Sequence, residues 1–145
     1  MNGTDLSTFH QPVSDLFVSS ASDQERDQWK LSADQIEFFN EHGYVVGPKV
    51  LTDLQIDRLR QELATLTEPG HPGSEFWYEY NSNESPDPSR VLFHALGAWR
   101  IAPAFHDILW NAAYTTPAAQ LLGGPVRFWH DQLFCKPAMH GGVVA

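Results

Sequence analysis

Two helix starts of the same design, twenty residues apart, most narrow what this chain can fold into. Ser32 with Gln35, and Thr52 with Gln55, have the spacing of a capping box, in which the first and fourth residues satisfy each other's backbone N–H groups. A leucine before and an isoleucine after each start have the spacing of a hydrophobic staple. The pattern predicts two helices, over residues 33–42 and 53–66.

A third constraint is an extended run near the end of the sequence, residues 126–135, which predicts a strand. Because successive side chains of a strand point to opposite faces, one face would carry Val126, Phe128, His130, Gln132 and Phe134. Neutral hydrogen-bonding groups between aromatic and aliphatic ones are typical of a pocket lining. Shorter strands are predicted at residues 44–46 and 91–96.

Two further helices complete the prediction. One begins at Pro103 and runs to about Tyr114, and another starts at Thr116 followed by Pro117, a residue that favours the first turn of a helix. The mixture of helices and strands indicates an α+β fold. We divide the chain into a polar, loosely ordered lead-in, residues 1–30, and one domain over residues 31–145.

The long connection over residues 68–90 contains an unusually aromatic segment, residues 76–80. A loop of about 20 residues in a compact domain is usually functional or mobile. Trp77 is therefore a candidate substrate contact in a lid. In the alternative interpretation, these aromatic side chains fold back onto the core.

Composition excludes several classes of protein. The net charge of −9 argues against binding to nucleic acid, which requires clustered Lys and Arg. No apolar stretch reaches the roughly 18 residues of a membrane span, and no secretory signal is visible. A single cysteine, Cys135, excludes a disulfide within the chain. We expect a cytoplasmic protein without a membrane or nucleic-acid partner.

None of the seven histidines carries the spacing of a metal site. No histidine has an acidic residue two positions later, as a non-haem iron site of the His-x-Asp type requires, and no zinc-protease motif is present. His94 and Trp99 are interpreted as structural. The sequence therefore predicts no metal ligand and no catalytic residue in this chain.

The order of these elements resembles the phytanoyl-CoA dioxygenase-like family. Residues 31–46, LSADQIEFFNEHGYVV, resemble the family's opening helix and strand, and Leu51 to Leu66 resembles its second helix. Residues 130–137, HDQLFCKP, resemble the strand that precedes the family's metal motif, with its Lys-Pro pair. The resemblance covers residues 31–145.

This resemblance implies a double-stranded β-helix (jelly-roll) that uses Fe(II) and 2-oxoglutarate to hydroxylate a small organic or acyl substrate. It places Gln132 toward the cosubstrate, where a neutral amide can bond a carboxylate, or alternatively in the barrel interior bonded to the backbone. His130 would contact substrate, or else be a hydrogen-bonded core histidine.

The resemblance also implies that residues 31–145 are the N-terminal part of such a domain. The iron ligands would follow the Lys-Pro strand, so the chain is expected to be truncated, inactive alone and unable to bind either cofactor tightly. Unpaired strand edges then predict self-association by strand exchange. The alternative is a non-catalytic binding or scaffold domain that uses the aromatic loop 76–80.

Overall fold

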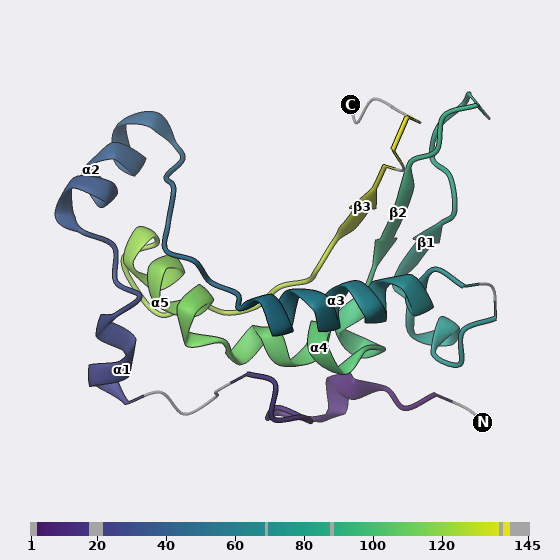
Figure 1. Ribbon diagram of the computed structural model, residues 1–145, viewed down its shortest axis with the longest axis horizontal. Coiled ribbons are helices and arrows are strands. Elements are labelled where there is room, and N and C mark those ends of the chain that lie inside the picture. The colour runs from purple at the N-terminus through teal and green to yellow at the C-terminus, as the bar shows by residue number, and fades with distance from the viewer. Residues whose placement is uncertain (1–2, 18–21, 69, 88, 137, 140–145) are drawn as a thin grey trace.

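The computed structural model describes residues 3–17, 22–68, 70–87, 89–136 and 138–139. Its helices are α1 (Asp23–Asp27), α2 (Ala33–His42), α3 (Asp53–Leu66), α4 (Pro103–Asp107) and α5 (Ala112–Leu121). Its strands are β1 (Glu79–Asn81), β2 (Phe93–Leu96) and β3 (Leu133–Cys135). Short 3-10 turns cover Leu6–Thr8, Ser74–Phe76, Ala98–Arg100 and Ile108–Trp110. Figure 1 shows α1, α2 and α5 at one end, the strands at the other, and α3 and α4 between them.

The two predicted helix starts are confirmed. The hydroxyls of Ser32 and Thr52 cap α2 and α3 by accepting from the backbone N–H groups of Gln35 and Gln55. The reciprocal bonds of the capping box run from the Ser32 and Thr52 N–H groups to the side-chain oxygens of the same glutamines. Helix α2 ends at Gly43, whose positive φ of 78° is a conformation that glycine adopts without strain. These boundaries match the predictions because the residues that set them are neighbours in the sequence.

The predicted helix from Pro103 to Tyr114 is interrupted. Helix α4 ends at Asp107, and after a 3-10 turn Asn111 starts α5 by accepting a hydrogen bond from the Ala113 N–H group at 3.0 Å. The predicted helix start at Thr116 is wrong, since Pro117 lies inside α5. Asparagine is among the strongest N-cap residues, and the Asn111 amide is also held by the Val50 carbonyl at 2.9 Å.

The predicted strand at residues 44–46 is also wrong. This segment is extended but pairs with no strand of the described residues, and Val46 is exposed. The Val46 carbonyl instead accepts a hydrogen bond from the Gln35 amide at 3.0 Å. Tyr44 packs edge-on against Phe38. A strand needs a partner for its backbone groups, and here a side chain fills that role.

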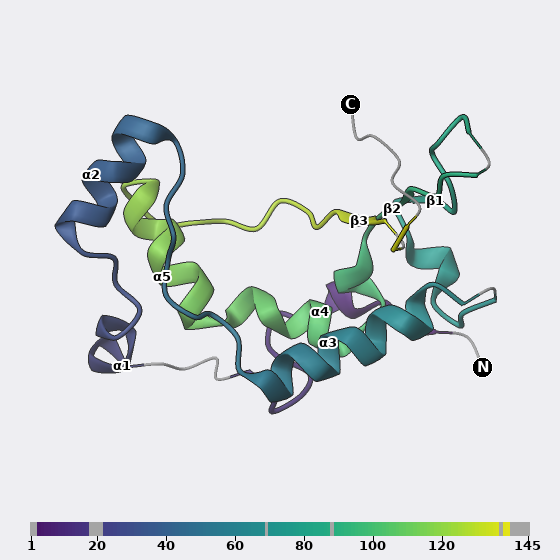
Figure 2. The same cartoon turned by 45° about the horizontal axis from the view of Figure 1, so that its top comes forward.

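The sheet is antiparallel with the order β1–β2–β3. The strand predicted over residues 126–135 contributes only Leu133–Cys135, and the preceding residues run as an unpaired extended segment from α5 to the sheet (Figure 2). The predicted strand at residues 91–96 is narrowed to Phe93–Leu96. Pro137 of the Lys-Pro pair and residues 140–145, with His140, lie outside the described residues. The fold is α+β.

The core joins helix and sheet. Leu66 at the end of α3, Ala98 and Ala102 form a buried cluster, and the side chains packed against it are those of Trp77, Ile101, Phe105 and Leu133. Burying such apolar side chains is the main favourable contribution to folding. None of the described helices is both long and apolar enough to cross a membrane.

Residues 3–17 are bound to the rest of the fold by several polar contacts, and the main ones involve the carboxylates of Asp5 and Asp107. Asp5 pairs with Arg100 at 2.5 Å. Asp107, fully buried at the end of α4, accepts hydrogen bonds from the backbone N–H groups of Val13 and Ser14, both at 2.8 Å. The start of the chain is thereby held along α4.

Candidate functional site

The two faces of the sheet differ because side chains alternate along its paired strands. One face carries Tyr80, Ala95 and Leu133, which lie opposite one another on the three strands. This is the core side of the sheet, because Leu133 packs against the core cluster. The opposite face, which we call the polar face, carries Glu79, Asn81, His94, Leu96 and Phe134, with Gln132 just before β3. Hydrogen-bonding groups therefore gather on the face turned away from the core cluster.

His94 lies at the centre of the polar face. The residue is only 7% exposed. The Phe134 ring stacks on the imidazole with a centroid separation of 4.4 Å and an interplanar angle of 2°. Nδ1 donates to Glu84 Oε1 at 2.5 Å, and the Gln132 amide donates to Nε2 at 2.8 Å. Both ring nitrogens are thus engaged and the ring orientation is fixed.

Two carboxylates face the same ring nitrogen. Glu79 Oε1 lies 4.0 Å from His94 Nδ1, beside the closer Glu84. The Asn81 amide bridges the pair, donating to Glu79 at 2.9 Å and to Glu84 at 3.3 Å. One ligand atom from each of Glu79, Glu84 and His94 lies within 4.8 Å of the others. We call these three residues the Glu79–Glu84–His94 group.

Asp131 sets the position of Gln132. The Asp131 carboxylate accepts hydrogen bonds from the N–H groups of Gly97 and Trp99, both at 2.8 Å, at the turn after β2. Burial raises the pKa of Asp131, against the opposing effect of these hydrogen bonds. Because neighbouring residues of extended backbone point to opposite sides, this anchor directs Gln132 toward His94.

His130 is not brought together with Gln132. It is exposed and lies in the unpaired segment before β3, where it lines a cavity of about 240 Å³ with Trp129, Phe128 and Leu122. The sequence pattern assigned His130 and Gln132 to one face of a long strand. That strand begins only at Leu133, so the alternation does not extend back to His130.

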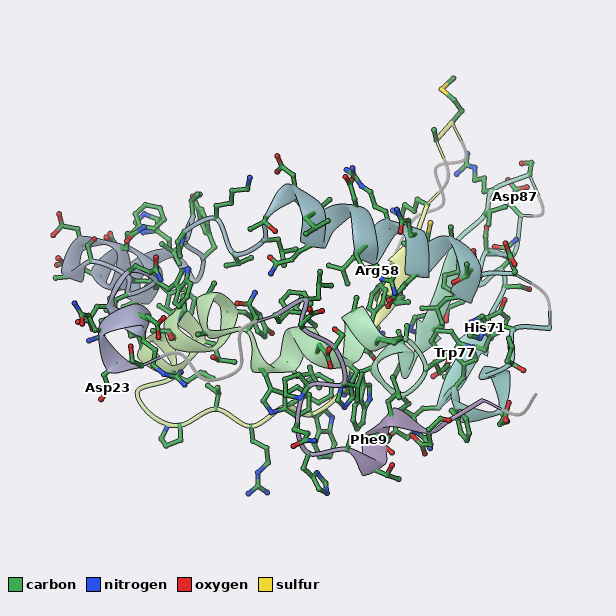
Figure 3. All side chains as sticks on the ribbon, turned by 60° about the horizontal axis from the view of Figure 1, so that its bottom comes forward. Phe9, Asp23, Arg58, His71, Trp77 and Asp87 are labelled. Atoms are coloured by element: carbon green, nitrogen blue, oxygen red, sulfur yellow. The ribbon has the colours of Figure 1, made fainter. Side chains whose placement is uncertain are left out.

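Trp77 lies elsewhere, on the core side of the sheet. It packs against the core cluster and lines a cavity of about 390 Å³ together with Tyr80, His71 and Leu66. Figure 3 shows Trp77 and His71 at the same end of the molecule. Tyr80 belongs to β1 and its ring also meets that of Phe93, so part of the segment at residues 76–80 is core and strand. The three predicted site residues therefore occupy three separate places.

The described residues do not fit the iron site of an Fe(II) oxygenase. Such a site uses two histidines and one carboxylate, whereas the group that approaches ligand distance here has two carboxylates and one histidine. The 2-oxoglutarate carboxylate would find one neutral amide at Gln132. On the polar face, the groups nearest to Gln132 are His94, Glu79 and Glu84. The two glutamates are negatively charged and would repel a carboxylate. Gln132 alone therefore fits a hydrogen-bonding role rather than a charge-pairing one.

Sequence reasoning missed the Glu79–Glu84–His94 group. From the sequence, His94 is interpreted as structural, and Glu79 and Glu84 lie in the long connection over residues 68–90. One signal was present, since Glu79 and Asn81 have the period of a strand face and His94 interrupts an apolar run. The pairing of β1 with β2, which joins them, involves residues 13 or more positions apart in the sequence.

A comparison of the sequence with protein-family models and with curated proteins found no match in either.

Proposed function

We propose that this chain forms the outer helices and part of one sheet of an Fe(II)- and 2-oxoglutarate-dependent dioxygenase resembling the phytanoyl-CoA dioxygenase-like family. The observation that favours this proposal is the polar face. In a jelly-roll enzyme the substrate lies inside the barrel, and a sheet with its core on one side and hydrogen-bonding groups on the other suits that arrangement.

In this proposal the iron ligands lie outside the described residues, and bound iron supplies the oxidising chemistry. The contribution of this chain is the polar face, where Gln132 offers a neutral amide to a carboxylate of the cosubstrate. The substrate is a small organic or acyl compound, and no nucleic acid or membrane takes part. The protein is cytoplasmic.

The proposal is tested with the protein expressed from its whole reading frame. We expect it to release succinate from 2-oxoglutarate when Fe(II) is added. We also expect the reading frame to encode a His-x-Asp sequence after residue 145, where the resemblance to the family implies the iron ligands. Gln132→Ala should raise the KM for 2-oxoglutarate about tenfold, the usual effect of losing one hydrogen bond of about 1.4 kcal/mol. Gln61→Ala, an exposed position on α3, is the matched control. A KM that is equal in the two variants, or a lack of succinate, contradicts the proposal.

The exposed sheet edge adds a proposal about self-association. In the order β1–β2–β3, the outer edge of β3 pairs with no other strand of the described residues. Unpaired edges promote strand exchange between chains. We expect light scattering on the 145-residue chain to report dimers or larger species that increase with concentration. A monodisperse monomer at all concentrations contradicts this expectation.

A second candidate function is a non-catalytic binding domain, favoured by the apolar cavity beside Trp77 and Tyr80. Cavities of this size, lined by aromatic side chains and a few polar groups, suit small ligands. This function requires binding that is independent of Fe(II) and 2-oxoglutarate. His71→Ala, which changes the cavity wall without removing the core residue Trp77, should weaken such binding, and the exposed His42→Ala should not.

A further inference from the structure

We propose that Glu79, Glu84 and His94 bind a divalent transition-metal cation such as Zn²⁺ on the polar face of the sheet. This site is separate from the iron of the proposed oxygenase and does not depend on that function. Its three residues come from β1, from the loop after β1 and from β2.

The geometry needs only small side-chain movements to become a coordination site. Ligands about 2.0–2.1 Å from a tetrahedral zinc ion lie about 3.3 Å from one another. The ligand atoms of the group are now separated by 2.5 Å (Glu84 to His94), by 4.0 Å (Glu79 to His94) and by at most 4.8 Å overall. The glutamate side chains can rotate, being 51% exposed at Glu79 and 33% at Glu84, while His94 is held. Three protein ligands leave the fourth position open to water or to a ligand.

The charge of the group is unbalanced without a cation. Glu79 and Glu84 direct carboxylate oxygens toward one imidazole, and among the described residues neither forms an ion pair with a lysine or arginine. The Asn81 amide contributes two neutral hydrogen bonds. By contrast, Oε2 of each glutamate accepts no hydrogen bond from the described residues, so both carboxylates retain capacity for a ligand.

Gln132 can support His94 in both states. Without metal, the Nδ1 proton is donated to Glu84 and Nε2 accepts from the Gln132 amide nitrogen. A metal on Nδ1 requires the other tautomer, in which the proton has moved to Nε2 through solvent and the imidazole stays neutral. Rotation of the Gln132 amide by 180° then presents its oxygen to the Nε2 proton. Metal-bound histidines typically donate their second N–H group to such an acceptor.

The mixed ligand set determines which cation fits. Imidazole nitrogen is a good ligand for zinc and other transition metals, whereas Mg²⁺ and Ca²⁺ prefer oxygen ligands alone. Two carboxylates and one neutral imidazole carry a charge of −2 together, so their complex with a dipositive ion has no net charge. We therefore expect Zn²⁺ to bind and Mg²⁺ not to displace it.

The test is calorimetric titration of the 145-residue chain with ZnCl₂, without iron or 2-oxoglutarate. We expect one saturable site whose Kd rises at least about tenfold in Glu79→Gln and in Glu84→Gln, since even outer partners of metal ligands contribute about 10- to 100-fold. Gln132→Ala removes such an outer partner, so we expect it to raise the Kd for zinc about 10- to 100-fold. Glu75→Gln, which makes the same charge change at an exposed glutamate in the 3-10 turn before β1, should bind like the unaltered chain.

Glu79 is exposed, so its replacement preserves the fold and circular dichroism provides the check. The proposal is overturned if Glu79→Gln and Glu75→Gln bind zinc equally, or if the unaltered chain shows no saturable site. Failure of the oxygenase proposal leaves this titration unaffected, because the titration uses only the 145-residue chain and does not involve succinate formation.

Discussion

Two histidine–carboxylate pairs in this molecule have nearly the same contact and very different surroundings. His94 Nδ1 lies 2.5 Å from Glu84, and His106 Nδ1 lies 2.8 Å from Asp107. The second pair is completely buried: the His106 ring contacts those of Trp99 and Trp110, and Asp107 binds the start of the chain. The first lies on the polar face.

The two carboxylates differ in how many further hydrogen bonds or ligands their oxygens can accept. The two oxygens of Asp107 accept four hydrogen bonds, two of them from Ser14 and the others from Val13 and His106. A carboxylate has about four lone-pair sites, so none is left for a ligand. Glu84 shares one oxygen between His94 and Asn81, and a second carboxylate lies beside it. The buried pair therefore stabilises the fold, and the pair on the polar face can bind.

The largest expected effect removes the buried carboxylate. Asp107→Ala leaves the N–H groups of Val13 and Ser14 and the His106 ring without their acceptor, so we expect a loss of about 3–5 kcal/mol in the free energy of unfolding. Urea denaturation measures this loss. Asp15→Ala, an exposed carboxylate in the same segment, should cost less than about 0.5 kcal/mol. Equal costs would show that the buried pair is not a structural anchor.

Zinc should stabilise the chain through the other pair. A ligand that binds only the folded state, at a free concentration one hundred times its Kd, adds about 2.7 kcal/mol to the free energy of unfolding. We expect the Tm to rise with ZnCl₂ in the unaltered chain and much less in Glu84→Gln. An equal rise in both proteins would place the zinc at other groups.

Acid should weaken the buried pair. Burial by itself would raise the pKa of Asp107, but hydrogen bonds from His106, Ser14 and Val13 outweigh it and hold the pKa below its ordinary value. The unfolded chain therefore binds a proton on this carboxylate more readily than the folded chain does. The ionised carboxylate stabilises the fold fully above the unfolded pKa of about 3.9. This contribution is lost as the pH falls through the lower folded pKa. Urea midpoints at a series of pH values should fall less steeply in Asp107→Asn than in the unaltered chain. Parallel curves would contradict this assignment.

The smallest effect concerns the cover of His94. Phe134→Ala removes the ring stacked on the imidazole, and we expect a loss of about 1 kcal/mol in the free energy of unfolding. Trp129→Ala, at a ring that is 86% exposed, is the control and should cost less. If both variants cost the same, stacking does not hold the His94 ring.

Prediction from sequence succeeded where the determining residues are neighbours. The starts of α2 and α3 depend on side chains three residues apart, and the class α+β follows from such local patterns. It failed where partners are distant. Residues 44–46 have strand composition but pair with no described strand. Residues 126–132 have the sequence pattern of a strand, but they too pair with no described strand. The pair Thr116–Pro117 has the composition of a helix start, but α5 begins earlier, at the N-cap that Asn111 provides.

The candidate site was less accessible to sequence reasoning than the fold. Gln132 was selected as a site residue, and the structure places it against His94. His94 itself, with Glu79 and Glu84, acquires its surroundings only when β1 pairs with β2. No spacing motif marks such a group because its members meet through the register of the sheet rather than along one element.

The central claim is that one histidine–carboxylate pair binds and the other only stabilises. Nitrogen NMR of the histidine rings during a zinc titration tests it most directly, because the ring nitrogens of His94 and His106 are observed together. The account predicts that Nδ1 of His94 shifts as zinc is added, and that both His106 nitrogens keep their initial shifts. A response at His106, or an unchanged His94 once the chain has bound zinc, would contradict it.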